Sequence, residues 1–422
     1  MNTAIEDSMK KERGGRGSRE DSEGKRVISF TSLGHFINDG TMFLVPVVLD
    51  LMAVVRHIDP IIITVSLTLF YLSMAATAVL LGGYIDRKGL QSSGMAMGIL
   101  TMSLGLLLFI AALDDLLTVA IIIISSILSG FGASFYHPTG TSMLQSHYRG
   151  EKLGRYLGIN GSFGSIGRAI YPYFLLAFIA YFASEVAGIG ILGTIGVLAA
   201  ISMFIGLRGY STPQYKEKKG AKEWKSTLSL SILLLTAISL IRSLAFYGIV
   251  SWIPEYLSFD RGLKANLSLG SMMSLMYVGG IVGQLIFGRL VEVYDKRRIL
   301  ATTTVLSAAL MYLYIITSGT LSYLFLGLFG LVNFSSFPIL MSMISDYVPR
   351  ESSTTTSNAL VWNVGGSGGQ ALGPLIVGVA IAGSYSNLPV VFEILLILAL
   401  VASVLTFVLP KPAVTKKAPI FG

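Results

Sequence analysis

Twelve long apolar stretches, joined by short polar segments, constrain this chain of 422 residues more than any other feature. A helix needs about 20 apolar residues to cross a bilayer. Charged residues make up only 13% of the chain, against roughly 25% in soluble domains, so they cannot coat a water-exposed surface. The sequence therefore predicts an all-α membrane protein with twelve transmembrane helices. The predicted spans are residues 27–52, 60–84, 93–112, 116–146, 156–180, 186–207, 227–257, 267–290, 299–317, 320–346, 357–382 and 389–410.

The basic residues are distributed unevenly between the loops. If the N-terminus is placed inside, all but five of the 31 Lys and Arg residues lie on the inner side. The exceptions are Arg56, Arg261 and Lys264 in outer segments, and Arg168 and Arg242 within spans. Inner loops of membrane proteins carry an excess of Lys and Arg. This pattern predicts a multi-pass protein of the cell membrane with both termini cytoplasmic.

The polar segments predict five regions. Residues 208–226 form the longest internal polar stretch and divide the spans into six and six. The basic charge of this segment could bind anionic lipid headgroups, or the segment could be a solvated linker. The expected regions are a disordered cytoplasmic tail (1–26), an N-terminal six-helix bundle (27–207), the linker (208–226), a C-terminal six-helix bundle (227–410) and a second cytoplasmic tail (411–422).

The two halves resemble copies of one another. Gly82 and Asp86 in the loop after span 2 correspond to Gly288 and Glu292 in the loop after span 8. The motif at 164–172 in span 5 corresponds to 366–374 in span 11, so Gln370 occupies the repeat position equivalent to Arg168. Paired halves with a binding site between them at the bilayer midplane are the architecture of secondary transporters.

The loop motif resembles the signature of the major facilitator superfamily. Gly82, Asp86, Arg87 and Gly89 fill that signature between spans 2 and 3. Its second copy after span 8 is weaker. The resemblance implies two pseudo-symmetric six-helix bundles that alternate in access to the two sides. We expect the motif to act as a cytoplasmic latch between helices, with the gating residues Gly82, Asp86, Arg87, Gly89, Gly288 and Glu292.

A narrower resemblance involves spans 1 and 4. The segment 32–40, followed by Pro46, and the segment 132–138 are similar to the fosmidomycin-resistance type of efflux protein. This similarity implies a proton-linked exporter of small anionic or amphipathic compounds. Drug antiporters of the superfamily carry a Gly-Pro pair in span 5, where this chain has Tyr171-Pro172. The departure leaves uptake open as the alternative to export.

Ionisable residues near the middle of the spans are the candidates for proton coupling. Charges inside a bilayer face a bundle interior or a wet cavity and usually serve a function. His35 and Asp39 are four residues apart, so they share one helical face, and imidazole exchanges protons near neutral pH. We assign proton coupling to Asp39, His35 and His137. Alternatively, His35 and Asp39 form a fixed structural pair, and His137 satisfies a carbonyl freed by Pro138.

Two intramembrane arginines are the candidates for substrate binding. A guanidinium stays charged and binds carboxylate or phosphonate through a planar fork. Arg168 and Arg242 lie one in each half and could clamp an anion between the bundles; alternatively each pairs internally, for example Arg168 with Asp39. Residues that could line the same cavity, or could simply pack, are Asn38, Tyr247, Trp362, Asn363 and Gln370.

Two weaker patterns also carry expectations. Glycines recur at three- and four-residue spacing in span 5, among them Gly164 and Gly167, and in span 11, among them Gly369 and Gly373. Small residues let membrane helices approach closely, so we expect spans 5 and 11 to pack against the opposite half. Glu255 lies near the outer end of its span, where solvation is easy, and we give it no role.

Several function classes are excluded by what the sequence lacks. It contains no phosphate-binding loop motif, no nucleophile motif, no cysteine and only four scattered histidines, so we expect no enzyme, no cofactor and no metal site. The expected protein is a monomeric proton-coupled exporter of a small organic solute, whose partners are that solute, protons and membrane lipids but no nucleic acid. The alternatives are an uptake symporter, an uncoupled facilitator, and a non-transporting sensor.

Overall fold

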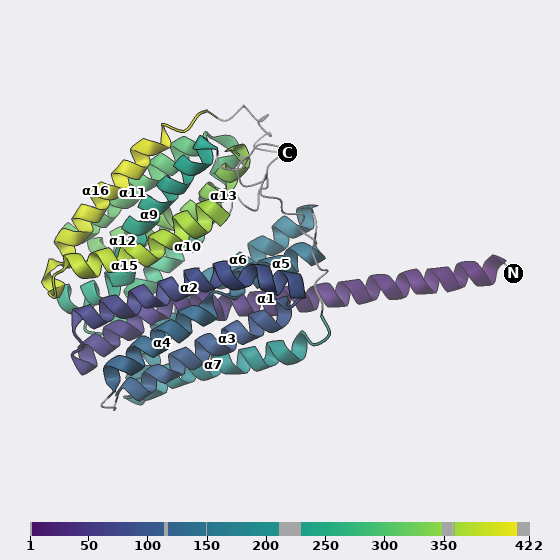
Figure 1. The fold of residues 1–422 in the computed structure, drawn as a ribbon, viewed down its shortest axis with the longest axis horizontal. Coiled ribbons are helices and arrows are strands. Elements are labelled where there is room, and N and C mark those ends of the chain that lie inside the picture. Colours follow the sequence, from purple (N-terminus) through teal and green to yellow (C-terminus); the bar gives the residue numbers. More distant parts are fainter. Residues whose placement is uncertain are drawn as a thin grey trace.

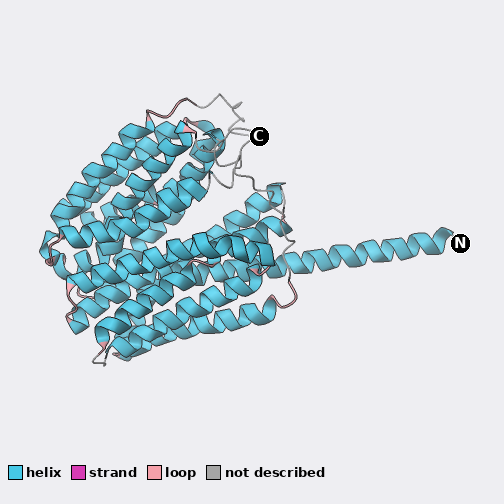
Figure 2. Ribbon diagram, viewed as in Figure 1, coloured by secondary structure: helices cyan, strands magenta, loops and turns pink. Residues whose placement is uncertain are grey.

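The computed structural model describes residues 2–113, 117–148, 150–210, 229–347, 357 and 359–411. Every regular element in that part of the chain is a helix (Figure 2). The helices form two bundles, one from each half of the sequence (Figure 1). The predicted all-α membrane fold with two six-helix bundles is confirmed.

The N-terminal bundle contains seven α-helices and one 3-10 helix. Its fourth predicted span is divided at Ser134 and Phe135, just before Pro138. Proline lacks the N–H that would bond the carbonyl four residues earlier, and its ring crowds that carbonyl. The elements are α1 (Asn2–Arg56), α2 (Pro60–Lys88), α3 (Gln91–Leu108), η1 (Phe109–Leu113), α4 (Thr118–Ala133), α5 (Tyr136–His147), α6 (Gly150–Phe182) and α7 (Glu185–Gly206).

The C-terminal bundle repeats this plan. Its helices α12 and α13 are divided at Phe334 and Ser335, before Pro338, as α4 and α5 are divided before Pro138. The elements are α9 (Leu230–Glu255), η2 (Tyr256–Asp260), α10 (Leu267–Val293), α11 (Lys296–Ile316), α12 (Thr320–Asn333), α13 (Ser336–Tyr347), η3 (Ala359–Ser367), α15 (Gly368–Ala380), η4 (Tyr385–Asn387) and α16 (Leu388–Thr406).

Ten helical segments among the described residues are long and apolar enough to cross a membrane. The other two predicted spans, 320–346 and 357–382, are each interrupted. The first is divided into α12 and α13, and the second changes from a π-helical segment, η3, to α15. Each of these two spans is therefore built from two shorter helical segments in place of one continuous helix.

Helix packing shows the internal two-fold relationship. Within the first bundle α1 packs on α6 and α3 packs on α4; the equivalent pairs in the second bundle are α9 with α15 and α11 with α12. Between the bundles α2 packs on α15, and α10 packs on α6. Spans 5 and 11 therefore contact the opposite half, as predicted.

The glycine stripes face a different neighbour from the one we predicted. A side chain at Gly167 would collide with the Phe36 carbonyl of α1, and one at Gly373 would collide with the Leu244 carbonyl of α9. These glycines therefore let α6 and α15 approach helices of their own bundle. Between the bundles, close approach occurs instead where Gly270 faces the backbone of Pro172.

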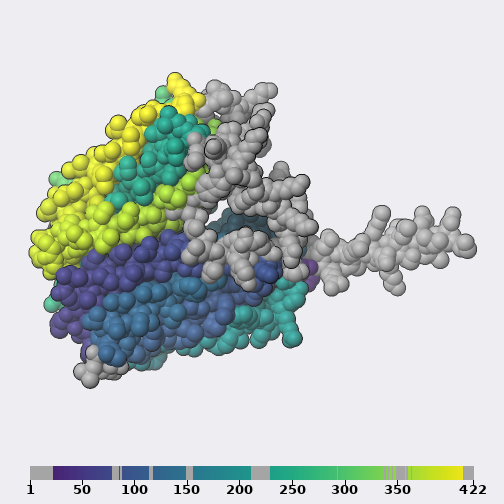
Figure 3. Space-filling model, viewed as in Figure 1, coloured from purple at the N-terminus to yellow at the C-terminus, as the bar shows by residue number. Residues whose placement is uncertain are grey.

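The two ends of the bundle pair differ. At the end where α1 finishes at Arg56, which we call the sealed end, Thr64 of α2 lies against Gly378 of α15. At the opposite, open end, no atom of the described residues lies within 4 Å of where a Cβ would stand on Gly158 or Gly161 of α6, or on Gly288 of α10. The space-filling view shows the bundles in contact at its left, the sealed end (Figure 3). Helices α6 and α10 thus diverge away from it.

The predicted tails and linker have mixed outcomes. The tail at 1–26, expected to be disordered, is helical from Asn2 onward as the first part of α1, which projects beyond the bundle in Figure 1. Lys, Glu, Arg and Met favour helix, and the segment continues a long membrane helix. Most of the linker at 208–226 and of the tail at 411–422 lies outside the described residues.

Candidate functional site

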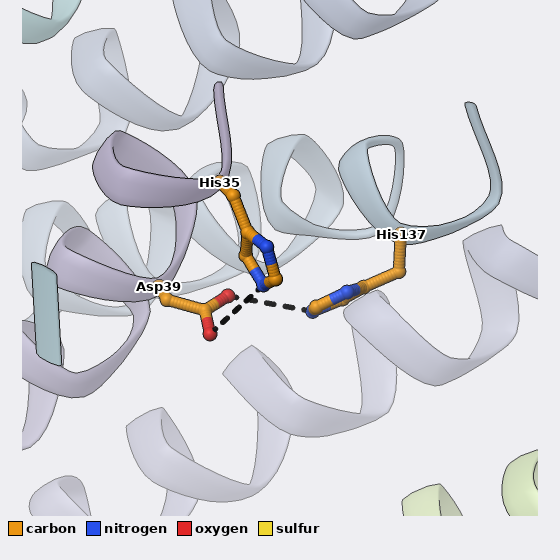
Figure 4. Close-up of side chains that lie close together, drawn as sticks. All are labelled: His35, Asp39 and His137. Atoms are coloured by element: carbon orange, nitrogen blue, oxygen red, sulfur yellow. Dashed lines mark ion pairs between the residues drawn. The ribbon is translucent and has the colours of Figure 1, made fainter. Parts of the chain in front are cut away.

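The three predicted coupling residues lie together, with both histidines in contact with the Asp39 carboxylate. Asp39 and His35 lie one turn apart on α1, and His137 reaches them from the start of α5 (Figure 4). Nε2 of His35 is 3.3 Å from Oδ2 of Asp39, and Nε2 of His137 is 3.5 Å from Oδ1. The aspartate is 5% exposed. The side chain of His137 is 48% exposed, so His137 is the member of the cluster that meets solvent.

His35 is held in place by a second set of contacts. Its Nδ1 lies 2.9 Å from Oδ1 of Asn160, and its ring stacks on Tyr136 with centroids 4.7 Å apart. The Tyr136 hydroxyl lies within donating distance of Asn160 Oδ1 and of the Thr31 carbonyl. With Asn160 Oδ1 as acceptor, His35 donates through Nδ1. A proton on Nε2 then makes the ring a cation that faces Asp39.

Arg168 contacts the same carboxylate from α6. Its Nε is 3.5 Å from Oδ2 of Asp39, and one of its terminal nitrogens donates to Ser165 Oγ at 2.8 Å. The guanidinium also lies over the rings of Phe43, at 5.4 Å, and Phe334, at 5.9 Å. Phe334 belongs to the other bundle, so Arg168 stands at the boundary between the two halves. The internal pairing of Arg168 with Asp39, one of the two predicted alternatives, is present.

The cluster therefore surrounds one carboxylate with three basic groups. A buried charge is tolerated where it is paired, and removing one partner leaves the other uncompensated. A proton added to Asp39 or to either imidazole changes the balance of charge around Arg168. Asn38 is fully buried and donates through Nδ2 to Asp39 Oδ1 at 3.2 Å, so it supports this carboxylate.

Arg242 forms a separate buried cationic site on α9. It is 4% exposed. Its Nε donates to Thr304 Oγ1, and one terminal nitrogen donates to the carbonyl and to the side-chain Oδ1 of Asn333, all at 3.2 Å. Its guanidinium lies 4.9 Å from the centre of the Phe246 ring. Among the ion pairs of the described residues none involves Arg242. Its positive charge is balanced only by neutral acceptors.

Tyr247 connects the two arginine sites. It lies five residues after Arg242 on α9 and interacts electrostatically with Arg168, Arg242 and the side chain of Gln370. Gln370, the repeat counterpart of Arg168, is 4% exposed. The structure thus brings both arginines, Tyr247 and Gln370 into one region between the bundles.

The remaining predicted residues are placed less completely. Trp362 is half-buried, within η3, and Asn363 lies outside the residues whose side chains are described. So do the side chains of Asp86, Arg87 and Glu292, and the surroundings of Gly82. Gly89 has φ of +68° directly after α2, the left-handed conformation in which helices commonly end at glycine. Gly288 faces open space.

The His35, Asp39 and His137 group could in principle hold a metal ion. Their ligand atoms lie within 4.8 Å of one another, and two imidazoles with a carboxylate are a common donor set for transition metals. However, the Arg168 guanidinium already stands beside Asp39, and it would repel a second fixed cation.

Two residues that contact the cluster were not predicted from the sequence. Asn160 is an isolated amide in span 5, and Tyr136 directly precedes His137. A buried amide within a membrane helix is itself unusual and could have marked Asn160. Its pairing with His35 joins residues 125 positions apart in the sequence, and no local spacing encodes that contact.

Comparison with known proteins points to one family. The model of the Major Facilitator Superfamily matches residues 31–360 and also 270–422. Protein TsgA of Escherichia coli O6:K15:H31 (strain 536 / UPEC) is 29% identical over 201 residues, which is 47% of this chain and 49% of that protein. Protein TsgA of Shigella sonnei (strain Ss046) is 28% identical with the same coverage, 47% and 49%. This chain spans about half the length of these curated relatives in the matched region.

Solved structures show a similar fold. A bacterial homolog of the human lysosomal transporter Spinster, in an inward-facing and unoccupied conformation, superposes with a TM-score of 0.69 at 13% identity. The match covers 92% of this chain and 96% of that one. The occupied inward-facing structure of a bacterial Spinster homolog gives the same TM-score, 0.69. At this identity the likeness shows the fold.

Proposed function

Because this chain belongs to the Major Facilitator Superfamily, we propose that it is a proton-coupled secondary transporter of a small organic anion. The family and the multi-pass helical fold point to a membrane transporter of small molecules rather than to an enzyme. Substrate, coupling and direction are the parts that we propose. We place both termini in the cytoplasm, following the charge of the loops, so that the sealed end faces outward and the open end inward.

The observation that carries the proposal is the contact of Arg168 with Asp39 beside two imidazoles. While Asp39 is ionised it neutralises Arg168. A proton on Asp39 releases the guanidinium, which can then bind a carboxylate or phosphonate through paired hydrogen bonds. Proton and anion would thus bind together, which favours cotransport in the direction of the proton gradient.

Arg242 supplies the second anchor. An anion bound near Tyr247 would have one guanidinium from each bundle within electrostatic reach. Each bundle would hold its own part of the substrate, and rocking of the bundles about this point would alternate its access to the two sides. Because one chain supplies both arginines, we propose that the protein acts as a monomer.

Export in exchange for protons is the second candidate. It is supported by the similarity of the segment containing His35, Asn38 and Asp39 to the fosmidomycin-resistance type of efflux protein. In that case the protonated imidazoles would hold the anion, and loss of their protons would release it. The two candidates differ in whether protons and anion move in the same direction.

Proteoliposomes test the proposal directly. Vesicles loaded with a pH-sensitive dye are given benzoate, methylphosphonate or fosmidomycin, without an imposed gradient. Cotransport predicts that inward movement of an anion acidifies the lumen, and exchange predicts that it makes the lumen alkaline. Anion flux with no change in pH, identical in the presence and absence of a pH gradient, would contradict proton coupling. Empty vesicles correct for diffusion of the neutral acids.

A further inference from the structure

Two carboxyl side chains are buried where the bundles meet at the sealed end. Asp50 near the end of α1 and Glu255 at the end of α9 are both 0% exposed. The expectation that Glu255 is solvated is therefore wrong. The helical chain continues past it through η2, and the neighbouring helices close around it.

A hydrogen bond across the bundle boundary links Asp50 to the segment that follows Glu255. The hydroxyl of Ser258 donates to Oδ2 of Asp50 at 2.6 Å, and Ser258 lies in the middle of η2, three residues after Glu255. Asp50 and Glu255 interact electrostatically with one another. Two acids from opposite bundles thus share one interior space.

Within the described part of the chain, the remaining oxygen atoms of these carboxyls have no hydrogen-bond partner. Oδ1 of Asp50 and both carboxyl oxygens of Glu255 lack a hydrogen bond, and neither residue takes part in an ion pair among the described residues. An ionised carboxylate buried without a partner is strongly disfavoured, and like charges in one site cannot both be ionised at low cost. The geometry therefore requires the acids to be neutral while the end is sealed.

Among the described residues, no basic side chain forms an ion pair with either carboxyl. Tyr71 of α2 and Tyr385 of η4 interact with Glu255, and Asp59 lies near Tyr385. Arg261, just after η2, is engaged by the Tyr256 hydroxyl and by carbonyls of Tyr314, Ile315 and Thr317. Helix α15, which packs on α9, contains no titratable residue.

Tyr385 lies near both the buried acids and the surface. Its ring stacks on Phe259 with centroids 4.1 Å apart, and its buried hydroxyl has no hydrogen-bond partner. The same tyrosine lines a surface pocket together with His57, Asp59, Asp260 and Ser386. Tyr385 therefore lines the outer pocket and also interacts electrostatically with both carboxyls.

We propose that Asp50 and Glu255 form a second proton-binding site, filled from the outer side, which holds the sealed end closed while it is protonated. When this end opens, water reaches both acids and they can release protons to the outside. Closure requires that protons be taken up again. These protons return to the side from which they came, so the site is distinct from the Asp39 cluster, whose protons we propose to be transported.

The inference depends on one part of the proposed function, which is that the sealed end opens during alternating access. Below the pH at which the acids ionise, the sealed arrangement is favoured; as pH rises, ionisation favours separation of α1 from α9. The number of protons linked to opening is the slope of the logarithm of the open-to-closed ratio against pH. We expect that slope to lie between one and two.

The test uses the full-length chain, which contains no cysteine, in lipid nanodiscs. Spin labels on Val55→Cys and Leu267→Cys, at the sealed ends of the two bundles, report the distance between them by double electron–electron resonance from pH 5.5 to 8.5. We expect a short distance at low pH and at least a fivefold larger population of a longer distance at high pH. The double variant Asp50→Asn, Glu255→Gln should keep the short distance throughout.

Further variants make the result specific. Glu255→Gln alone should reduce the slope to one or less, and it provides the test if the double variant does not fold. Asp260→Asn, whose acid already pairs with Arg261, should leave the response unchanged. Asp39→Asn should also leave it unchanged, so transport equal to that of the parent with an intact pH response would refute the proposed function alone.

Three outcomes would overturn this inference. The first is full pH dependence retained in the double variant, or none in the parent. The second is a short distance at pH 8.5 in sodium buffer that lengthens in choline buffer, which would make the pair a cation site. A response abolished only by Asp39→Asn would assign the pH dependence to the central cluster.

Discussion

Asp39 and Arg168 form an ion pair, with Nε 3.5 Å from Oδ2, that joins helix α1 to helix α6 beside the ring of Phe334 from the opposite bundle. Because two histidines contact the same carboxylate, this pair is where protonation can alter the charge offered to a substrate. The relationship gives the first prediction.

Asp39→Asn should separate substrate binding from proton binding. The amide is neutral at every pH, so Arg168 is no longer neutralised by a carboxylate. Anion binding should become nearly independent of pH, and proton-driven flux should fall at least tenfold. Thermal-shift titrations with benzoate at pH 6 and pH 8, together with proteoliposome flux, measure both effects. Asp260→Asn serves as the matched control, and flux equal to that of the parent would clear Asp39 of the coupling role.

Arg242→Gln should weaken anion binding without abolishing folding. The guanidinium donates to neutral acceptors of Thr304 and Asn333, which glutamine can partly satisfy. Loss of charged hydrogen bonds worth ~1.5–3 kcal/mol corresponds to about 10- to 100-fold weaker binding. Isothermal titration calorimetry, with the anion that the parent binds most tightly, gives the ratio of the two dissociation constants. The exposed Arg208→Gln should bind as the parent does, and an equal loss in both variants would indicate a non-specific effect of charge.

Gly167→Ala and Gly161→Ala, on the same helix, should have different effects on the stability of the protein. A methyl group at Gly167 would strike the backbone carbonyl of Phe36, and overpacking of this kind costs about 1–3 kcal/mol. At Gly161 no protein atom lies within 4 Å, so alanine should be neutral or stabilising by up to about 1 kcal/mol. Thermal unfolding in detergent compares the two. Equal melting temperatures would mean that α6 does not pack on α1 at this glycine.

Asp295 should stabilise the second bundle in a pH-dependent way. Hydrogen bonds from Arg297 lower the pKa of Asp295 below its usual 3.8, and its Oδ1 accepts from the Arg297 backbone N–H at the start of α11. A lowered folded-state pKa gives stability that is present above 3.8 and is lost as pH falls through the folded-state value. Because the group is largely solvated, Asp295→Asn should cost at most about 1 kcal/mol at pH 7.

The measurement for Asp295 is the difference in melting temperature between parent and variant at several pH values. This difference should shrink as pH falls below 3.8, the usual pKa of the carboxyl. A difference that stays constant from pH 7 to pH 3 would show that the carboxylate charge contributes nothing. Asp260→Asn, at the other end of the molecule, gives the reference for a solvated acid.

Much of the fold was predictable because hydrophobic length and helical spacing are local properties. The one-turn separation of His35 and Asp39 placed them on one face, and the repeat placed Gln370 opposite Arg168. Two interruptions in the long spans also follow from Pro138 and Pro338. These features depend on residues close together in the sequence, or on matching positions in the two halves.

What could not be predicted depends on how helices rotate against one another. Periodicity does not say that Gly167 faces α1 rather than the other bundle. Nor does a position near a span end reveal that Glu255 is closed in by neighbouring helices, or that Ser258 bonds Asp50 across the boundary. Asn160 meets His35 only after α6 has packed on α1. Each of these contacts is a product of tertiary packing.

The division of the fourth span has one further geometrical consequence. His137 is the second residue of α5, directly after the turn, whereas the far end of the twelve-residue helix lies about 18 Å away. A swing of ten degrees about the turn would carry that far end by roughly 3 Å while scarcely shifting the imidazole. The open end of the first bundle can therefore widen or narrow by rotation of α5 about this turn, while His137 keeps its contact with Asp39.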